Sequence, residues 1–341
     1  MSFNYSESGM KKTPSRLDDP RSTLISPYVD NEFIANDAAC PACHSSQLAR
    51  MSRVAHDGGH GERVSVLECQ QCHLAWQYPL SRTPAQSVAY FADQYAAAQD
   101  QSYFDKDTRP GVAALQLKFV QSLRPHPTTL LDIGAGDGTF IDAAAQAGWT
   151  CLGSEPAASP EFHRTVTGGG SATLTRERAE SLQGRRFDVV TLWDVIEHVE
   201  RPVELLRMAA SLLSDNGVLI VETGNYCSAD RLEGGNSWWC YQLDHRWYFS
   251  PTTLQSMLQG LQLPHLHLAD RVFRPWWAGQ AHYAAPSWWR TGKALLRAPW
   301  RSGQTIRHHA QLRNAEQHWN PGAGLGVFTV AASRVAVRAT P

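Results

Sequence analysis

The segment Thr128-Thr-Leu-Leu-Asp-Ile-Gly-Ala-Gly-Asp-Gly-Thr-Phe140 decides the fold of this chain. An apolar run ends in three alternating glycines, Gly134, Gly136 and Gly138, and a helix-like segment follows at once. A short apolar strand that enters a glycine-rich turn and then a helix is typical of the first βα unit of a nucleotide-binding sheet. Glycine is needed there because the turn is tight and a ligand lies against bare backbone.

The spacing of these glycines separates two kinds of nucleotide site. A dinucleotide fingerprint places its third glycine three positions after the second, whereas Gly138 follows Gly136 by two. The spacing therefore disfavours a dehydrogenase. Glu155 ends the next apolar segment, where a carboxylate at a strand end can bind both hydroxyls of a ribose.

Strand-like and helix-like segments alternate beyond the glycine turn. The pattern predicts strands at 149–156, 186–193, 218–223, 263–273 and 324–335, a helix at 202–213, a turn at 215–217 and a helix capped by Ser250. This rhythm predicts an α/β fold, a Rossmann-like and mostly parallel sheet with helices on both faces. The last strand would return to the same sheet.

Two Cys-x-x-Cys pairs precede this sheet, Cys40 with Cys43 and Cys69 with Cys72. Two such knuckles can close a tetrahedral Zn²⁺ site, so we expect a small structural zinc ribbon at 36–80. His44 and His73 follow the pairs and also complete the c-type haem attachment pattern, which remains an alternative. Haem attachment normally occurs outside the cytoplasm, and one zinc ion accounts for all four thiolates.

The composition sets limits on location and partners. The chain has 341 residues, 43% of them hydrophobic and 18% charged, with a net charge of −1. This charge argues against a global attraction to nucleic acid. Residues 1–20 lack the apolar core of a secretory signal, and no apolar run has transmembrane length. We therefore expect a cytoplasmic protein in a reducing compartment, where clustered cysteines bind metal.

Several motifs together resemble one enzyme family over roughly residues 127–270. They are Asp132-Ile-Gly-Ala-Gly-Asp-Gly138, Glu155, Phe187-Asp-Val-Val190, Glu197-His-Val199 and the strand 217–222. In this order they resemble the class I S-adenosylmethionine-dependent methyltransferases. The preceding cysteine pairs further resemble zinc-binding deoxysugar C-methyltransferases and related enzymes of surface-polysaccharide pathways. The Glu-His-Val step also resembles the quinone-pathway O-methyltransferases.

The resemblance implies S-adenosylmethionine as cofactor, together with Zn²⁺ in the ribbon. It places the cofactor-binding residues at Asp132, Gly134, Ala135, Gly136, Gly138, Glu155, Ala179, Trp193 and Asp194. The family often has an acid that meets the adenine amino group just before the segment 179–182, where this chain has Arg178. Adenine contact would then come from the Ala179 backbone or from a neighbouring acid.

Methyl transfer needs in-line positioning and removal of a proton from the acceptor. Histidine is the natural base near neutral pH, and His198 follows a strand at the sheet edge where ligands bind. His245 is the second candidate, and Glu197 would orient the base or replace it. A second interpretation makes Asp194, Glu197 and His198 the ligands of a divalent cation.

Two aromatic regions bear on the acceptor and on partners. The aromatic excursion at 226–249 suits a pocket that stacks on a sugar or a ring, or else it is well-packed core. The insertion at 271–323 has no acidic residue before 314 and is rich in arginine and tryptophan. Its segment 286–301 would touch the inner face of a membrane as a basic amphipathic helix, or else cover the sheet edge. Nucleic acid is the third option, against which overall neutrality argues.

The predicted organisation has four parts: a flexible tail at 1–35, the zinc ribbon at 36–80, a helical connector at 81–126 and a methyltransferase domain at 127–341. Tyr95 of the connector would pack between domains or lie over the ligand. The predicted function is methyl transfer to an oxygen or carbon of a sugar or glycan-type acceptor. One alternative is O-methylation of a quinone-like or small aromatic hydroxyl, and another is a non-catalytic ribbon module. The sequence leaves the oligomeric state open.

Overall fold

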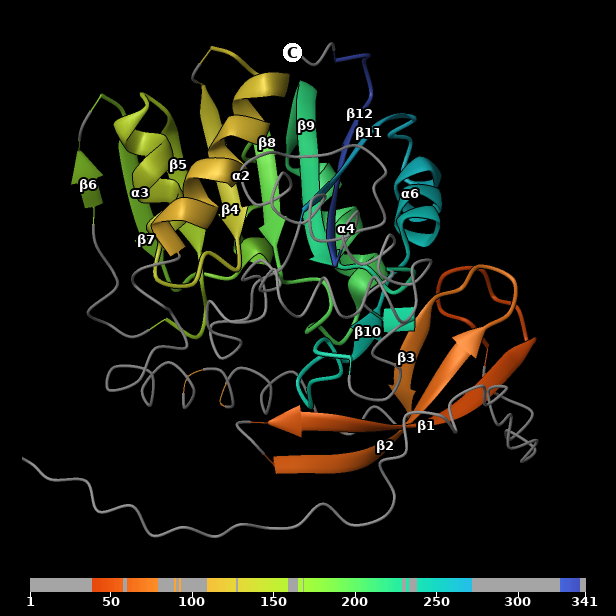
Figure 1. The fold of residues 1–341 in the computed structure, drawn as a ribbon. Coiled ribbons are helices and arrows are strands. Elements are labelled where there is room, and N and C mark those ends of the chain that lie inside the picture. Colours follow the sequence, from red (N-terminus) through yellow and green to blue (C-terminus); the bar gives the residue numbers. More distant parts are fainter. Residues whose placement is uncertain are drawn as a thin grey trace, which may run out of the picture.

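The computed structural model describes residues 39–57, 60–78, 89, 92, 109–126, 128–158, 165–167, 169–228, 231–232, 238–271 and 326–337. These residues form a large sheet with helices on both faces and a smaller sheet beside it (Figure 1). The predicted tail at 1–35, Tyr95 and the basic segment 286–301 lie outside the described residues. Of the connector, the structure describes mainly its last helix.

The large sheet has eight strands in the order β11-β12-β9-β8-β4-β5-β7-β6. Its five central strands, from β9 to β7, are parallel, and the pairs at both ends are antiparallel. The strands are β4 (Thr129–Ile133), β5 (Thr150–Ser154), β6 (Thr165–Thr167), β7 (Ser171–Thr175), β8 (Phe187–Trp193), β9 (Leu213–Gly224), β11 (His265–Arg271) and β12 (Val327–Ser333). The predicted α/β fold with a mostly parallel sheet is confirmed.

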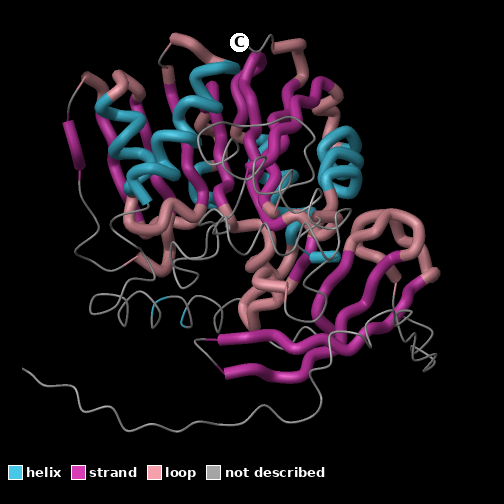
Figure 2. The backbone as a smooth tube through the Cα atoms, in the orientation of Figure 1, coloured by secondary structure: helices cyan, strands magenta, loops and turns pink. Residues whose placement is uncertain are grey.

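Helices cover the two faces of this sheet separately (Figure 2). On one face α2 (Arg109–Leu123) and α3 (Thr139–Gln146) pack through Phe119 and Phe140 against Leu130 and Val189. On the other face lie η2 (Ala179–Leu182), α4 (Pro202–Ser211) and α6 (Pro251–Gly260), with Leu206 and Leu254 in a second core. Ser250 caps α6 by accepting a hydrogen bond from the Thr253 amide, as predicted. Among the described residues, no helix is long and apolar enough to cross a membrane.

One of the two late strands, β9, differs in detail from the prediction, and the other, β12, agrees with it. The turn predicted at 215–217 is wrong, because β9 runs through it with a bulge opposite Phe187 and Val189. Asp188 fixes this irregularity, since its carboxylate accepts hydrogen bonds from the hydroxyls of Thr129 and Ser214. The strand β12 does return to the sheet, where it lies between β9 and β11.

The smaller sheet contains the cysteine pairs, and it is completed by a distant segment. Its strands are β1 (Leu48–Asp57), β2 (His60–Cys69), β3 (Ala75–Tyr78) and β10 (Trp247–Tyr248), in that order. β10 pairs antiparallel with β3 through Trp247–Trp76 and Tyr248–Ala75. The ribbon therefore shares a sheet with the methyltransferase-like region.

The aromatic excursion is packed core in the part that the structure describes. Tyr226, Trp238, Tyr241 and Tyr248 are each about 1% exposed and contact one another edge to face or stacked. They share a core with Val66 and Ala75 of the small sheet. These rings therefore form the well-packed core that the sequence left open as the alternative to an acceptor pocket, and they join the segments after β9 to the small sheet.

Candidate functional site

The glycine turn has a backbone that other residues rarely adopt. Gly134, Gly136 and Gly138 have φ values of 76°, 57° and 83°, all in the left-handed region. A Cβ on Gly134 would lie 2.4 Å from Cγ2 of Val195, so the turn after β4 abuts the turn after β8. These two turns lie at the carboxyl edge of neighbouring parallel strands, where open α/β sheets bind ligands.

Glu155 lies against this turn from the end of the adjacent strand β5. Its carboxylate accepts a hydrogen bond of 3.1 Å from the Gly136 N–H and one of 3.0 Å from the Ala157 N–H. The side chain is 6% exposed. A buried carboxylate held beside a glycine turn has the chemistry to bind two vicinal hydroxyls of a ribose.

Asp132 lies beneath the turn in β4 and is almost fully buried. Burial, with the negative charge of Glu155 as a second cause, raises the pKa of its carboxyl group to about 7. The Thr191 hydroxyl donates a 2.7 Å hydrogen bond to it and opposes this rise. A second acid, Asp137, accepts hydrogen bonds from Arg109 and the Thr139 amide and so holds α2 to the turn.

The remaining residues predicted to bind the cofactor surround the same edge. Ala135 and Ala179 are buried, and Ala179 begins η2 directly after the exposed Arg178. Trp193 ends β8 with its ring packed edge-on against Phe140, at 5.3 Å between centroids. Its side chain therefore belongs to the core, while the strand end that it occupies faces the site.

Asp194 follows β8 with a φ of 53°, which is unusual for a residue other than glycine. Residues held in sparsely populated backbone regions cluster at functional sites. Its amide donates a 3.2 Å hydrogen bond to the Glu222 carbonyl of β9. The strained turn starts the segment that carries Glu197 and His198.

Glu197 is a buried acid without full hydrogen bonding. It is 2% exposed, and its Oε2 atom has no hydrogen-bond partner among the described residues. Burial and the neighbouring charge of Asp194 raise the pKa of its carboxyl group well above the ordinary value. A buried carboxyl group of this kind tends to keep its proton and to act as a donor.

His198 is paired with an acid that the sequence did not single out. Its Nδ1 atom lies 3.2 Å from the Asp244 carbonyl oxygen and 3.6 Å from the Asp244 carboxylate. These two acceptors favour a proton on Nδ1, so that a neutral ring carries its lone pair on Nε2. The imidazolium form would also be stabilised by Asp244.

His245 lies against His198, with ring centroids 4.7 Å apart in an edge-to-face arrangement. It is buried, and its Nδ1 lies 2.9 Å from the Cys240 carbonyl oxygen and 3.2 Å from the Cys240 sulfur. Burial, with the charge of His198 as a second cause, lowers the pKa of His245 to about 4. His245 is therefore neutral at physiological pH, and it supports the ring of His198.

Among the described residues, Glu197, His198 and His245 each have a ligand atom within 4.8 Å of the others. The group could hold a divalent cation, as the second interpretation of the sequence requires. Its composition differs from the expected one, since His245 takes the place of Asp194.

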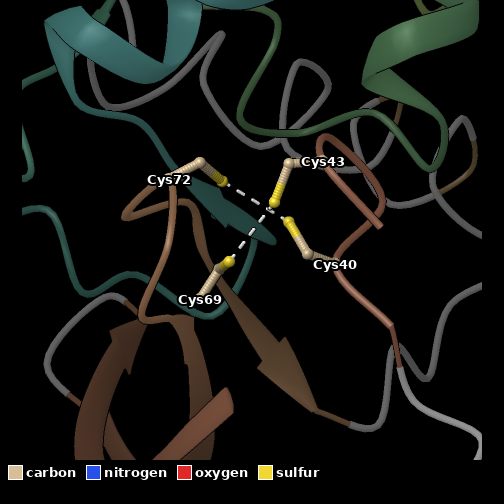
Figure 3. Close-up of side chains that lie close together, drawn as sticks. All are labelled: Cys40, Cys43, Cys69 and Cys72. Carbon is tan, nitrogen blue, oxygen red and sulfur yellow. Dashed lines mark hydrogen bonds between the residues drawn. The ribbon is translucent and has the colours of Figure 1, made fainter. Parts of the chain in front are cut away.

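The four cysteines of the two predicted knuckles meet at one point (Figure 3). Their sulfurs all lie within 4.8 Å of one another, with Cys40 and Cys72 at 3.5 Å and Cys43 and Cys69 at 3.5 Å. The knuckles have the same backbone pattern, since the Cys40 amide bonds the Ser45 carbonyl and the Cys69 amide bonds the Leu74 carbonyl. The thiol of Cys72 hydrogen-bonds the sulfur of Cys40 and lowers its pKa to about 5.

This sulfur arrangement fits a structural zinc ion. A tetrahedral site with Zn–S bonds of about 2.3 Å needs sulfurs roughly 3.8 Å apart, close to the observed separations. All four cysteines are free thiols, and both of the following histidines, His44 and His73, are exposed with φ near 60°. Haem attachment would need the two cysteines of each pair to face a macrocycle of their own. Here each short sulfur–sulfur contact joins a cysteine of one pair to a cysteine of the other pair. The geometry therefore favours one ion over haem.

Comparison with known proteins finds similarity to methyltransferases over the region that contains this site. Residues 104–268 match the family described as "Methyltransferase domain", a range that includes every residue predicted for cofactor binding and proton transfer. Ubiquinone biosynthesis O-methyltransferase of Azorhizobium caulinodans is 31% identical over 169 residues, which are 46% of this chain and 66% of that protein. The enzyme of the same name from Chelativorans sp. is 28% identical over 180 residues, which are 51% of this chain and 64% of that protein.

Solved structures of methyltransferases also resemble the chain. Magnesium protoporphyrin IX methyltransferase from Synechocystis PCC 6803 with bound SAH has 13% identity and a TM-score of 0.48, over 74% of this chain and 100% of that chain. A SAM dependent methyltransferase from Archaeoglobus fulgidus has 18% identity and a TM-score of 0.43, over 65% of this chain and 92% of that chain. The chain spans just under two thirds of the length of the two curated relatives.

Proposed function

We propose that this chain, whose residues 104–268 match the family described as "Methyltransferase domain", is a class I methyltransferase and transfers the methyl group of S-adenosylmethionine to a hydroxyl oxygen of a small molecule. One observation carries the proposal. The glycine turn with Glu155 and the segment with Glu197 and His198 lie at the same sheet edge, in contact through Gly134 and Val195. A cofactor cradle and a base thus share one site.

The residues divide the chemistry between binding and proton removal. When bound, S-adenosylmethionine supplies a methyl group on a sulfonium, which is already activated for transfer. Glu155 and the amide groups of the glycine turn bind its ribose and its amino-acid portion. The Nε2 atom of His198 takes the hydroxyl proton of the acceptor, while Asp244 stabilises the resulting imidazolium.

A ring-borne hydroxyl is the first candidate for the acceptor. The curated relatives described above are named ubiquinone biosynthesis O-methyltransferases, which supports an aromatic hydroxyl over a sugar. The burial of Trp238 and Tyr241 supports the same choice, because these two rings are not exposed to stack on a glycan. A phenolic hydroxyl also has a lower pKa than a sugar hydroxyl, so a histidine base suffices.

A sugar or glycan acceptor is the second candidate. It rests on the four-cysteine group ahead of the domain, because this group is the feature that resembles the zinc-binding deoxysugar C-methyltransferases. We propose that the group holds Zn²⁺. In that role the metal is structural, because four protein sulfurs leave no open coordination position.

Trideuteriomethyl-labelled S-adenosylmethionine separates the two candidates. The protein is incubated with substituted catechols and hydroxybenzoates in one arm and with nucleotide-linked sugars in the other. The expected result is a product of increased mass in the phenol arm, absent with His198→Ala. Transfer to sugars alone would overturn the proposed acceptor, and transfer in neither arm, with no cofactor binding, would overturn the proposed function.

A further inference from the structure

The loop that carries Asp244 and His245 is enclosed between two other segments. On one side the Glu197 carbonyl accepts hydrogen bonds from the amides of Arg246 (2.8 Å) and Trp247 (3.1 Å). The Trp247 indole also donates a 2.6 Å hydrogen bond to the Val199 carbonyl. These bonds fasten the loop to the segment that contains His198.

On the other side the loop is held by one side chain of the small sheet, Gln77 in β3. Its amide nitrogen Nε2 lies 2.9 Å from the Gln242 carbonyl, 2.8 Å from the His245 carbonyl and 3.2 Å from the Tyr248 hydroxyl. Its backbone N–H donates a 2.9 Å hydrogen bond to the Arg246 carbonyl. Gln77 therefore binds the loop both before and after Asp244.

We propose that Gln77 is a positioning residue for methyl transfer and that the cysteine-bearing sheet is thereby a working part of the catalytic site. The inference rests on the proposed function and deepens it. Gln77 does not act on the acceptor itself. It holds Asp244 where its carbonyl and carboxylate face the Nδ1 atom of His198.

The chain between Gln77 and the cysteines is short and well anchored. β3 begins three residues after Cys72, and the Leu74 carbonyl between them accepts the Cys69 amide. The Cys72 carbonyl in turn accepts a hydrogen bond from the Thr253 hydroxyl at the start of α6. A change in the geometry of the cysteine site therefore reaches the loop through β3.

An amide matters at this position because two carbonyl oxygens and a hydroxyl face its nitrogen atom. A glutamine NH₂ group donates, whereas a glutamate carboxylate of the same shape only accepts. Gln77→Glu would place a charge against two carbonyl oxygens and release the loop. A displacement of about 1 Å in a catalytic constellation costs on the order of 100-fold in rate.

The test measures turnover of Gln77→Glu and Gln77→Ala beside the control Gln70→Ala, an exposed glutamine of the same ribbon. We expect kcat to fall at least 10-fold in both Gln77 variants, with KM for S-adenosylmethionine within 2-fold of wild type. The Gln70 variant should match the wild type. Equal kcat in all four proteins would overturn the proposal.

A double-mutant cycle with Asp244→Asn distinguishes positioning from general destabilisation. If Gln77 acts through Asp244, adding Gln77→Glu to Asp244→Asn lowers kcat no further. If Gln77→Glu lowers kcat by the same factor with and without Asp244→Asn, Gln77 does not act through Asp244.

Hydrogen exchange of the peptide 238–250 gives a readout that does not depend on turnover. Gln77→Glu should accelerate exchange there and leave 129–158 unchanged. Chelation of the bound metal from the wild type should accelerate exchange in the same peptide. If the wild type shows no turnover with any acceptor, the proposed function fails. Exchange in 238–250 that is unchanged by Gln77→Glu then overturns the coupling as well.

Discussion

The backbone N–H of Gly136 donates a 3.1 Å hydrogen bond to the carboxylate of Glu155, although the two residues follow different strands of the sheet. The bond joins the turn after β4 to the end of β5 and aligns a negative charge with a stretch of bare backbone. In the proposed function this pair binds the ribose of the cofactor. It also brings the charge of Glu155 close enough to Asp132 to contribute to the raised pKa of that group.

Glu155→Gln keeps the shape of this side chain and removes its charge. Hydrogen bonds to charged groups contribute about 1.5–3 kcal/mol, so the affinity for S-adenosylhomocysteine should fall by about 10- to 100-fold. Glu204→Gln, at an exposed position of α4, is the matched control. Calorimetric titration of the three proteins measures the effect, and equal affinities would remove Glu155 from the cofactor site.

Gly134→Ala tests the close approach of the two turns. Its Cβ would meet Val195 at 2.4 Å, and its φ of 76° disfavours any side chain. Gly184→Ala is the control, because Gly184 also has positive φ but nothing within 4 Å of its Cβ position. We expect a loss of about 2–4 kcal/mol in the free energy of unfolding for the first variant and about 1 kcal/mol for the second. Thermal unfolding measures both losses. Equal losses of stability in the two variants would show that the contact between the new Cβ and Val195 has no energetic consequence.

His198→Ala removes the proposed base without touching the glycine turn. Turnover should fall by about 100- to 10,000-fold while the affinity for S-adenosylhomocysteine stays within a few-fold of wild type. Asp244→Asn should cause a smaller fall, because the His198 ring loses the carboxylate that faces its Nδ1 atom at 3.6 Å. Full activity of His198→Ala would transfer the role of base to another group.

His245→Asn tests the acid sensitivity of the fold. Burial lowers the pKa of His245 to about 4 from 6.5, so the unfolded chain binds more protons than the folded protein between these values. The free energy of unfolding should therefore decrease as pH falls from 6.5, and the loss should be complete below about 4. For this group the loss amounts to about 3 kcal/mol. Asparagine keeps a donor toward the Cys240 carbonyl but does not titrate, so urea unfolding of the variant should show a shallower pH dependence.

Cys69→Ser tests the metal site. One of four sulfurs is lost, so zinc content measured by mass spectrometry should fall from about one ion per chain to near zero. The melting temperature should fall with it, because the ribbon core includes Leu67 and Leu74 beside the cysteines. Cys227→Ser, an exposed cysteine outside the cluster, should change neither quantity. A full zinc content in Cys69→Ser would argue against a four-sulfur site.

The parts of the fold that local chemistry determines could be predicted from the sequence. The alternating glycines require left-handed backbone, and all three adopt it. The apolar runs became the parallel strands, and Ser250 before Pro251 became a helix cap as expected. The Asp-Asn-Gly turn at 215–217 was wrong because pairing with β8 and the bonds to Asp188 outweigh a local turn preference.

Contacts between distant segments could not be predicted in this way. The partnership of His198 with Asp244 depends on how the loop 240–248 folds back, and no periodicity encodes it. The pairing of β3 with β10 joins segments about half the chain apart. The density of aromatic residues at 226–249 left an acceptor pocket and a packed core open, and the sequence did not show that the rings would pack with the small sheet.

The most direct test of this account is calorimetric titration of the purified protein with S-adenosylhomocysteine, beside a nicotinamide dinucleotide. We expect micromolar binding of the first at a stoichiometry of about one, weakened in Glu155→Gln, and no heat from the second. Binding of the dinucleotide alone, or of neither ligand by a folded protein, would contradict the assignment of the glycine turn to S-adenosylmethionine.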